Sequence, residues 1–375
     1  MKIIVVSDTV ATESNLELFK KENVINLVGK DIYEKLHFAD IVIANLEAPL
    51  YDSNNAMEKF GPNLATPSKC VDGLTGLNIN VVNMANNHIM DHGIAGLENT
   101  CKVLASEKIN YVGVGRNTNE MTDAFYFEMD GCKLGIYSCA EHEFSCASRK
   151  SAGANPFDPL VSFDRVADIS SKCDYVIVLY HGGHEFYRLP SPELQRRCRK
   201  FIDKGANFVV TQHSHCIGAR EAYENGEILY GQGNFIFDMS DNEYTQSGFM
   251  ISIDIQERKK SQIEYIPIIK KKEKIRIAEK DEKEEIMRMF RENSLKVDDY
   301  DYIDSMYDVF AIKNAQKYLK RIHGNNTIFK IINKLTKGHY ISSIYSKNSG
   351  LGTLNYIECE THNELLIRII KNNLK

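Results

Sequence analysis

The chain has 375 residues, of which 43% are hydrophobic and 26% are charged, as in an ordinary globular protein. That length suffices for one large domain with an extension or for two domains. The formal net charge of −5 argues against a nucleic-acid-binding protein, because such proteins usually present a basic surface.

No segment of the chain is suited to spanning a membrane. The apolar run at residues 2–6 is soon followed by Asp8 and is too short for the core of a signal peptide. The other apolar runs fall short of the roughly 20 residues that a spanning helix needs. The nine cysteines show no CxxC spacing, which is typical of reduced, buried thiols. We therefore expect a cytoplasmic protein with no membrane span.

The first third of the chain alternates between strand-like and helical segments. Residues 2–7, 40–44 and 79–84 are short runs rich in Val and Ile, and polar residues follow each of them. A helix is predicted over residues 70–77, between the second and third runs, and another opens at Asp91 after the third. Such alternation predicts a parallel sheet flanked by helices. Residues 51–67, rich in Asn, Gly and Pro, form a loop that could overhang one edge of this sheet.

A β–α–β unit lies in the middle of the chain. Residues 174–181 and 207–212 are apolar runs with the composition of buried strands, and histidines follow directly at their ends. Between them, Ser191 is the predicted N-cap of a helix that stops at Gly205. Both strands therefore deliver their histidines to the same edge of a sheet.

Hairpin signals occur on both sides of this unit. Asp130-Gly131 separates two strand-like runs and predicts a type I′ turn. The strands expected near 248–255 and 262–269 are also hairpin-like. The mixture of parallel and hairpin-connected strands predicts two packed sheets with helices outside them.

The character of the chain changes near residue 270. Residues 270–292 carry charges of both signs, which predicts a solvated helix. Further helical stretches are predicted near 305–322, 326–337 and 361–374, and no chemical motif occurs there. We therefore predict a main domain over residues 1–275 and a helical extension over residues 276–375.

Seven polar residues share one property, because each lies within a few positions of the end of an apolar strand-like run. They are Asp8, Glu47, Asn87, His88, His181, His213 and His215. In a parallel sheet such ends converge on one edge, and carboxylates held together there repel one another unless cations relieve the repulsion. Oxygen and imidazole ligands without thiolate suit one or two divalent ions of Zn, Mn or Fe.

The spacing of these residues indicates roles for several of them. His213-x-His215 places two side chains on the same side of an extended segment, and Glu47 is the natural carboxylate to bridge two metals. His88 could protonate a leaving oxygen. Asp91 either orients His88 or caps the helix that begins there. Glu185 either faces the substrate or has a structural role, and scattered structural residues remain the alternative to a metal site.

With these residues assembled, the chain resembles the bacterial CapA/PgsA family of capsule and poly-γ-glutamate synthesis proteins, which is related to calcineurin-like metallophosphoesterases. The matching segments span roughly residues 1 to 270. They are Asn45-Leu-Glu47-Ala-Pro-Leu50, Asn83-Met-Ala-Asn-Asn-His88 with Asp91-His-Gly93, His181-Gly-Gly-His-Glu185, Gly205 to His215, and Gly233-Asn234-Phe235.

The resemblance implies an α/β fold, a four-layer α/β/β/α sandwich of the metallophosphoesterase type, with a C-terminal, mostly helical extension. It also implies a metal shell in which Glu47 is the bridging acid and His88 the acid catalyst, with Asp8, Asn87, His181, His213 and His215 as further ligands. The general phosphoesterase pattern has a histidine two residues after its first aspartate, where this chain has Val10. That departure leaves the number of metals open.

The leading hypothesis is a metal-dependent phosphoesterase acting on a phosphorylated small molecule or polymer in capsule, surface-polysaccharide or related polymer metabolism. The alternatives are a non-hydrolytic accessory protein, whose tail docks partner proteins of polysaccharide synthesis or export, and a metal-dependent amide-bond enzyme.

Overall fold

The computed structural model describes residues 1–239, 242–256, 261–322, 326–345 and 347–373. The chain divides into two compact units, Met1–Ile303 and Asp304–Lys375.

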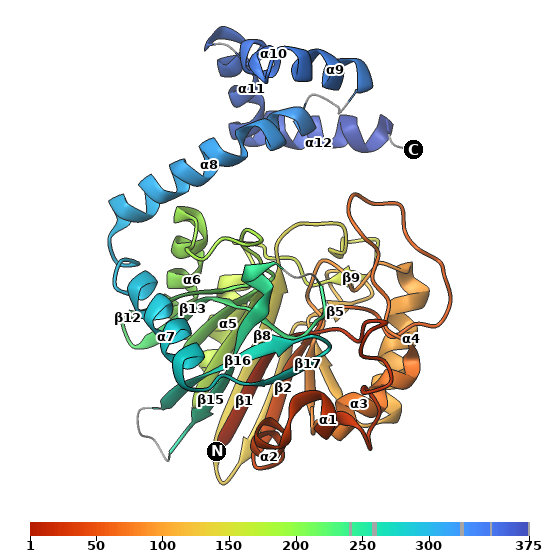
Figure 1. Cartoon of the computed structure of the whole chain (residues 1–375). Coiled ribbons are helices and arrows are strands. Elements are labelled where there is room, and N and C mark those ends of the chain that lie inside the picture. The colour runs from red at the N-terminus through yellow and green to blue at the C-terminus, as the bar shows by residue number, and fades with distance from the viewer. Residues whose placement is uncertain (240–241, 257–260, 323–325, 346, 374–375) are drawn as a thin grey trace. The chain divides into compact units, whose positions relative to one another are not determined.

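The first unit contains two large sheets (Figure 1). In one, the four consecutive strands β1 to β4 run parallel, and β15, β16 and β17 extend the other edge as antiparallel strands. The order across this sheet is β17 (Lys274–Ile277), β16 (Gln262–Lys271), β15 (Ser247–Asp254), β1 (Lys2–Thr9), β2 (Ile41–Leu46), β3 (Val81–Asn83) and β4 (Asn110–Val112), with β14 (Asn234–Ile236) paired to β1.

The second sheet has four parallel strands in its centre and an antiparallel strand at each edge. Its order is β12 (Ile217–Tyr223), β13 (Gly226–Gln232), β11 (Phe208–Gln212), β10 (Tyr175–His181), β8 (Cys132–Ala140) and β7 (Ala124–Met129). A small third sheet joins β6 (Met121–Thr122), β5 (Val114–Gly115) and β9 (Gly153–Ala154). The turn between β7 and β8 has positive φ at both Asp130 and Gly131, which confirms the predicted type I′ hairpin.

The two large sheets pack face to face because their strands alternate apolar side chains between two faces. Ile3 and Val5 of β1 share a buried core with Ile177 and Val210 of the second sheet. Ile4, on the other face of β1, packs instead with the helices of the first flank. These are α1 (Val24–Val28), α2 (Lys30–His37), η1 (Ser68–Cys70), α3 (Val71–Gly76) and α4 (Gly93–Ser106).

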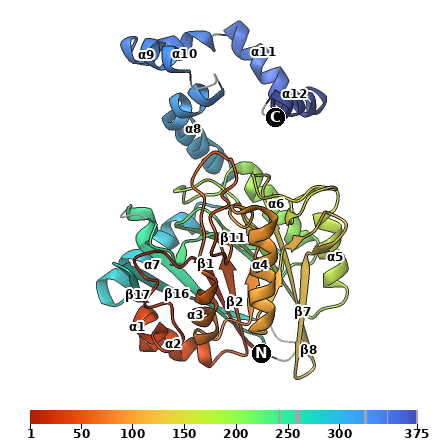
Figure 2. The ribbon, with the colours of Figure 1, turned by 90° about the vertical axis from the view of Figure 1, so that its right-hand side faces the viewer.

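Two further helices, α5 (Ser162–Ser170) and α6 (Pro192–Asp203), cover the outer face of the second sheet (Figure 2). There the ring of Phe201 lies 6.2 Å from both Tyr137 and Tyr180, measured between ring centroids. Helices, two sheets and helices follow one another, so the predicted α/β/β/α sandwich is confirmed. A short 3₁₀ helix, η2 (Glu243–Gln246), precedes β15.

The central β–α–β unit forms as its sequence predicts. Ser191 caps α6, because its Oγ accepts a hydrogen bond from the backbone N–H of Leu194 at 3.1 Å. Pro192 is the first helical residue, and Gly205 follows the helix with φ +98°, a conformation that favours glycine. The strands β10 and β11 pair in parallel, so both end at the same edge.

The charged stretch after residue 270 differs from the prediction of a solvated helix. Its first residues complete β16 and form β17, and the helix α7 (Lys280–Ser294) follows. Phe290 of α7 is buried against Phe249 and Tyr265, with ring centroids 4.8 and 5.1 Å apart. This packing makes α7 part of the first unit, which ends at Ile303 rather than at the predicted residue 275.

The second unit is helical, as predicted. Its helices are α8 (Tyr300–Ile322, beginning in the first unit), α9 (Thr327–Leu335), α10 (His339–Ile344), α11 (Lys347–Glu358) and α12 (Glu360–Asn373). Residue 374, the end of the last predicted helix, lies outside the described residues. Within the described parts of the chain, we find no helix with the length and apolar character needed to cross a bilayer.

Candidate metal centre

The strand register places polar residues side by side at one edge of the eight-stranded sheet. Asp8 on β1 lies opposite Asn45 on β2 and Asn234 on β14, and Asn45 lies opposite Asn83 on β3. Glu47 follows β2 directly. The neighbouring sheet contributes His181 at the end of β10, so the parallel strands of both sheets deliver polar groups to one place.

Five of the six predicted metal ligands form one cluster. Candidate ligand atoms of Asp8, Glu47 and His181 all lie within 4.8 Å of one another, and the same holds for Glu47, His213 and His215. Glu47 belongs to both groups, which is the position expected of a bridging carboxylate. All five side chains are buried.

The sixth predicted ligand, Asn87, adjoins the cluster through His181. The Asn87 Oδ1 lies 3.0 Å from the His181 Nε2, and the same nitrogen lies 3.6 Å from the Glu47 Oε1. Asn87 is half-buried. Its amide oxygen therefore stands where it could share a cation with His181.

Three of the four carboxylate oxygens in this cluster lack a hydrogen-bond donor among the described residues. Both oxygens of Glu47 and the Oδ2 of Asp8 are buried without a hydrogen bond among the described residues. The nearby His215 Nδ1, 3.2 Å from the Asp8 Oδ2, makes its hydrogen bond with the Asn234 Oδ1 at 2.9 Å. Buried polar groups are almost always paired, and an unpaired buried acceptor costs about 1–3 kcal/mol or more when charged. The residues therefore fit a divalent cation.

The carboxyl groups of Asp8 and Glu47 have pKa values that are shifted in opposite directions. Burial raises the pKa of Glu47 well above its usual value, and the negative charge of Asp8 raises it further. Burial also acts to raise the pKa of Asp8, but the close approach and charge of His215 outweigh it and lower this pKa to about 2. A cation between the two groups would favour the ionised form of Glu47 and so act to lower its pKa.

Two of the three imidazoles are held in the neutral state that binds metals. Burial lowers the pKa of His181 well below its usual value and also lowers the pKa of His213. The Nδ1 of His213 is buried without a hydrogen-bond partner in the described chain. Burial acts to lower the pKa of His215 too, but interaction with Asp8 raises it overall.

The two histidines after β11 reach the cluster by a different backbone path from the predicted one. His213 has φ +96° and His215 has φ +53°, so this segment is a bend and not an extended strand. The fold does bring His213 and His215 together, as predicted. The predicted cause, the alternation of side chains along an extended strand, is wrong. The bend turns both side chains toward Glu47.

His88 and Asp91 form a pair beside the cluster. The His88 Nδ1 lies 2.6 Å from the Asp91 Oδ2, so Asp91 orients the imidazole. The helix α4 begins at Gly93 with His92 at its N-cap position, and Asp91 therefore does not cap it. Of the two predicted roles for Asp91, the structure favours the orienting one.

Sequence reasoning missed Lys59, which lies in the loop of residues 51–67. Its side chain is only 2% exposed, its Nζ is in contact with the Asp91 Oδ1, and it lies 3.2 Å from the His88 Nδ1. The Asp91 Oδ2 also accepts a hydrogen bond from the backbone N–H of Leu64 at 2.6 Å. The predicted overhanging loop is thus fastened to the His88–Asp91 pair, and nothing in the local sequence pattern indicated this.

A network of amides beneath the cluster was also missed. The Asn45 Nδ2 donates to the Asp8 Oδ1 at 2.7 Å, and the Asn83 Nδ2 donates to the Asn45 Oδ1 at 3.2 Å. The Asn83 Nδ2 also donates a hydrogen bond to the Gln212 Oε1 in the other sheet at 3.3 Å. The Gln212 Nε2 donates in turn to the Gln232 Oε1. Buried, hydrogen-bonded networks of this kind hold side chains in one arrangement.

Two other positions bear on the predicted site. Glu185 is exposed and does not belong to the groups with metal-binding geometry, although its charge contributes to raising the pKa of Glu47. Its catalytic role stays a prediction. Val10 is buried with Ala48 and Phe237 in a small apolar cluster, so the position of the usual phosphoesterase histidine is apolar here.

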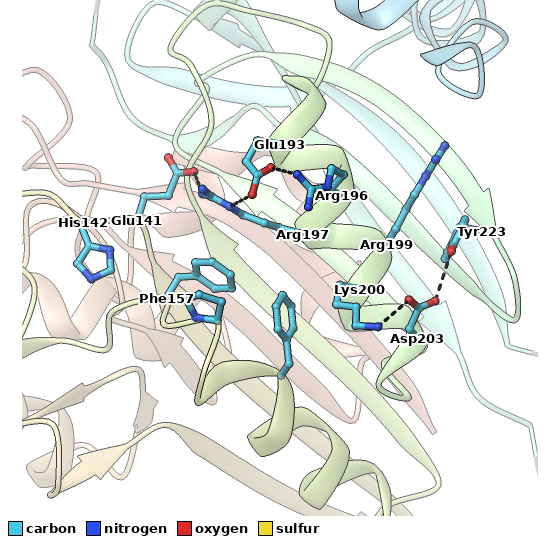
Figure 3. A pocket seen from close by; sticks show the side chains of 12 residues that line it. Glu141, His142, Phe157, Glu193, Arg196, Arg197, Arg199, Lys200, Asp203 and Tyr223 are labelled. Atoms are coloured by element: carbon cyan, nitrogen blue, oxygen red, sulfur yellow. Dashed lines mark hydrogen bonds and ion pairs between the residues drawn. The ribbon is translucent and has the colours of Figure 1, made fainter. Parts of the chain in front are cut away.

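A cavity of about 670 Å³ lies along α6, and the residues that line it do not include the six predicted metal ligands. Figure 3 shows its charged side chains pairing with one another: Arg197 contacts Glu141 and Glu193, and Lys200 contacts Asp203. The cavity adjoins the loop after β10, where the Glu141 Oε2 accepts a hydrogen bond from the backbone N–H of Gly183. Because its charges are paired internally, the cavity has no single preferred ligand charge.

Residues 3–239 match the family model described as "Bacterial capsule synthesis protein PGA_cap". The chain belongs to this family. The matched range includes all nine residues predicted for the site, because it extends over every strand end that contributes to the cluster.

Curated relatives support this membership. The chain is 27% identical over 235 residues to the PGA biosynthesis protein CapA of Bacillus subtilis, which covers 61% of this chain and 61% of that protein. It is 26% identical over 231 residues to the capsule biosynthesis protein CapA of Bacillus anthracis, covering 58% and 56%. A probable polyglutamine synthesis accessory protein of Mycobacterium tuberculosis is 26% identical over 212 residues, covering 53% and 56%. The chain thus spans only about three fifths of the length of these relatives.

Solved structures with a similar fold include phosphatases and nucleotidases. A novel phosphatase from Mycoplasma pneumoniae is 17% identical with a TM-score of 0.45, covering 72% of this chain and 93% of that chain. A putative 5'-nucleotidase from Staphylococcus aureus is 13% identical with a TM-score of 0.43, covering 77% and 57%. Both TM-scores lie below 0.5, so the family assignment depends on the sequence match.

Proposed function

We propose that this protein is a metal-dependent hydrolase of phosphoesters that acts in capsule, surface-polysaccharide or related polymer metabolism. Its substrate is a phosphorylated small molecule or polymer, its location is the cytoplasm, and proteins of polysaccharide synthesis are its partners. The observation that carries the proposal is Glu47, a buried carboxylate with no hydrogen bond in the described chain, placed among three histidines. The capsule-synthesis family supports the setting.

The donor set supports one or two divalent ions of Mn, Zn or Fe. The residues that would hold them are Asp8, Glu47, Asn87, His181, His213 and His215. Carboxylate, amide and imidazole ligands suit these metals, and no thiolate belongs to the groups with metal-binding geometry among the described residues. When bound, such a cation supplies Lewis acidity toward a phosphoryl oxygen and a water nucleophile near neutral pH.

The remaining chemistry belongs to His88. Its Nδ1 is held by Asp91, which leaves the Nε2 to donate a proton to a leaving oxygen. Lys59 and the backbone of Leu64 hold the carboxylate of Asp91 in turn. His88 is 9% exposed, so it lies at the boundary between the buried ligands and solvent, where a leaving group departs.

A second candidate function is that of a non-hydrolytic accessory protein of polymer synthesis or export. Two observations favour it. The buried Val10 occupies the position where the general phosphoesterase pattern has a histidine, and one relative carries the name of a probable synthesis accessory protein. Without that imidazole, a metal site could position a ligand without turning it over.

A substrate screen separates the two candidates. Purified full-length protein, stripped and then reloaded with Mn, Zn or Fe, is assayed on phosphomonoesters and phosphodiesters, and its metal content is measured by elemental analysis. The hydrolase proposal expects turnover that falls by about 10²–10⁴-fold in His88→Asn and is abolished in His181→Ala and His213→Ala. If the protein binds no divalent metal, or if both alanine variants keep full activity, the proposal is wrong. Metal binding without turnover of any ester favours the accessory role.

A further inference from the structure

The second unit has the opposite charge from the rest of the chain. Residues 304–375 contain 11 Lys and Arg against 5 Asp and Glu, a net charge of +6, while the whole chain has a net charge of −5. The positive charge is concentrated, because residues 309–357 contain eight Lys and Arg and no Asp or Glu. Such a basic stretch attracts an anionic partner.

The second unit also exposes much of its apolar surface. Of the 26 large hydrophobic residues that are exposed in the described chain, 15 lie in this unit of 72 residues. Among the described residues of this unit, Ile341 is the one buried hydrophobic residue. A unit with so small a core of its own leaves apolar side chains in water, and patches of this kind mark interaction surfaces.

The helix α9, labelled in Figure 1, combines apolar and basic side chains on its exposed surface. Ile328, Ile331 and Leu335 are 64%, 55% and 78% exposed, and their spacing of three and four residues puts them on one face of the helix. The side that packs within the unit is a different one, where Phe329 stacks on Tyr340 with ring centroids 5.9 Å apart.

Lysines lie beside the apolar face of α9. Lys330 and Lys334 are both exposed, and Lys337 follows in the turn after the helix. A stripe of exposed Ile and Leu next to lysines is typical of a helix that lies in the interface of a bilayer, with its apolar side chains among the acyl chains and its lysines among the headgroups.

We propose that the second unit, Asp304–Lys375, binds the surface of a bilayer that contains anionic phospholipids. A nucleic acid or an acidic polymer would satisfy the lysines, but it offers no apolar environment to the exposed Ile and Leu side chains. A bilayer satisfies both. Because no described helix is both long and apolar enough to span the membrane, the proposal places the unit on the surface, where it keeps the protein at the membrane.

Vesicle sedimentation of the full-length protein tests this proposal. Vesicles of phosphatidylcholine alone are compared with vesicles that also contain phosphatidylglycerol. We expect binding to the anionic vesicles and little to the neutral ones, with an affinity that falls as salt is added. Three lysine substitutions made together should weaken binding about 100-fold, since each basic residue near the surface contributes about fivefold. They are Lys330→Gln, Lys334→Gln and Lys337→Gln.

Two further variants show which feature matters. The apolar variant replaces exposed side chains of α9 and should lose vesicle binding while circular dichroism stays unchanged: Ile328→Ser, Ile331→Ser and Leu335→Ser. The matched control removes three exposed lysines of the first unit and should bind as the unchanged protein does: Lys272→Gln, Lys280→Gln and Lys283→Gln. Equal binding by all variants, or equal binding to neutral vesicles, would overturn the proposal.

Self-association is the competing explanation for the exposed apolar face. Sedimentation velocity of the full-length protein without lipid distinguishes it. If the protein is a dimer that the serine variant of α9 separates, and if neither form binds anionic vesicles, the face joins two copies and the proposal is wrong. None of these measurements uses phosphoesterase activity, so the result is independent of the proposed function.

Discussion

Replacing Glu47 by glutamine should change the stability of the metal-free protein in an unusual direction. The carboxylate is fully buried without a hydrogen bond in the described chain, and burial raises its pKa well above the usual value. The folded state therefore holds the Glu47 proton more tightly than the unfolded state does. Stability of the metal-free protein then falls as pH rises from the unfolded pKa of about 4.3 through the raised folded pKa, and glutamine removes this loss.

The size of the effect follows from the two unpaired oxygens. An unsatisfied buried polar group costs about 1–3 kcal/mol, more when charged, and the glutamine amide keeps part of that cost. We therefore expect Glu47→Gln to stabilise the metal-free protein by about 2 kcal/mol at pH 8, and by less at pH 5. For a unit that spans Met1–Ile303, that corresponds to about 3 °C in Tm.

Adding the cation should reverse the order of stability. At a metal concentration 100 times its Kd, the unchanged protein gains about 2.7 kcal/mol, while the variant has lost a charged ligand and gains less. Differential scanning calorimetry in EDTA and in excess Mn measures which of the two proteins is more stable without and with the cation. The matched control is Glu128→Gln, at an exposed position. A variant that is less stable than the unchanged protein in EDTA, or one stabilised equally by Mn, would contradict the assignment of Glu47 to a cation site.

Three further changes test other parts of the structure. Lys59→Met should cost about 3–5 kcal/mol in urea unfolding, because it removes the lysine that neutralises the buried Asp91 and leaves the Asp91 Oδ1 without this partner; the double variant with Asp91→Asn should recover most of this, and no recovery would argue against the ion pair. His213→Ala should weaken metal binding, measured by calorimetric titration, at least tenfold, and an unchanged affinity would exclude this ligand. Phe290→Ala should destabilise the first unit by about 3–5 kcal/mol, whereas an unchanged unfolding midpoint would place α7 outside it.

The fold was predictable where signals are local. The unit from β10 to β11 has apolar runs of strand length, a Ser-Pro helix start and a glycine stop, and each signal acts within a few residues. The turn at Asp130-Gly131 depends on two residues alone. The position of α7 was not predictable in this way. Its sequence is mostly charged, so the burial of Phe290 is not evident from it. That burial depends on the rings of Phe249 and Tyr265, which belong to strands of the sheet.

The site was predictable to the same extent. A polar residue after an apolar strand can be seen in the sequence, and such residues converge in any parallel sheet, so the amino-acid sequence is enough to group Asp8, Glu47 and His181. Lys59 lies in a loop without periodicity, and the charge it meets is 32 residues away in the chain. No local pattern reports such a contact, because it exists only when the loop folds over the sheet edge.

Local patterns in this chain were therefore enough to predict the strands, their polar ends and a set of donors that would suit a metal. Long-range packing settled the rest: the bend that turns His213 and His215 inward, the lack of hydrogen-bond partners at Glu47, and the contacts of the loop residue Lys59. The physical reason is that backbone preference acts over a few residues, whereas burial, and with it the charge and acidity of a side chain, depends on every segment that closes around it.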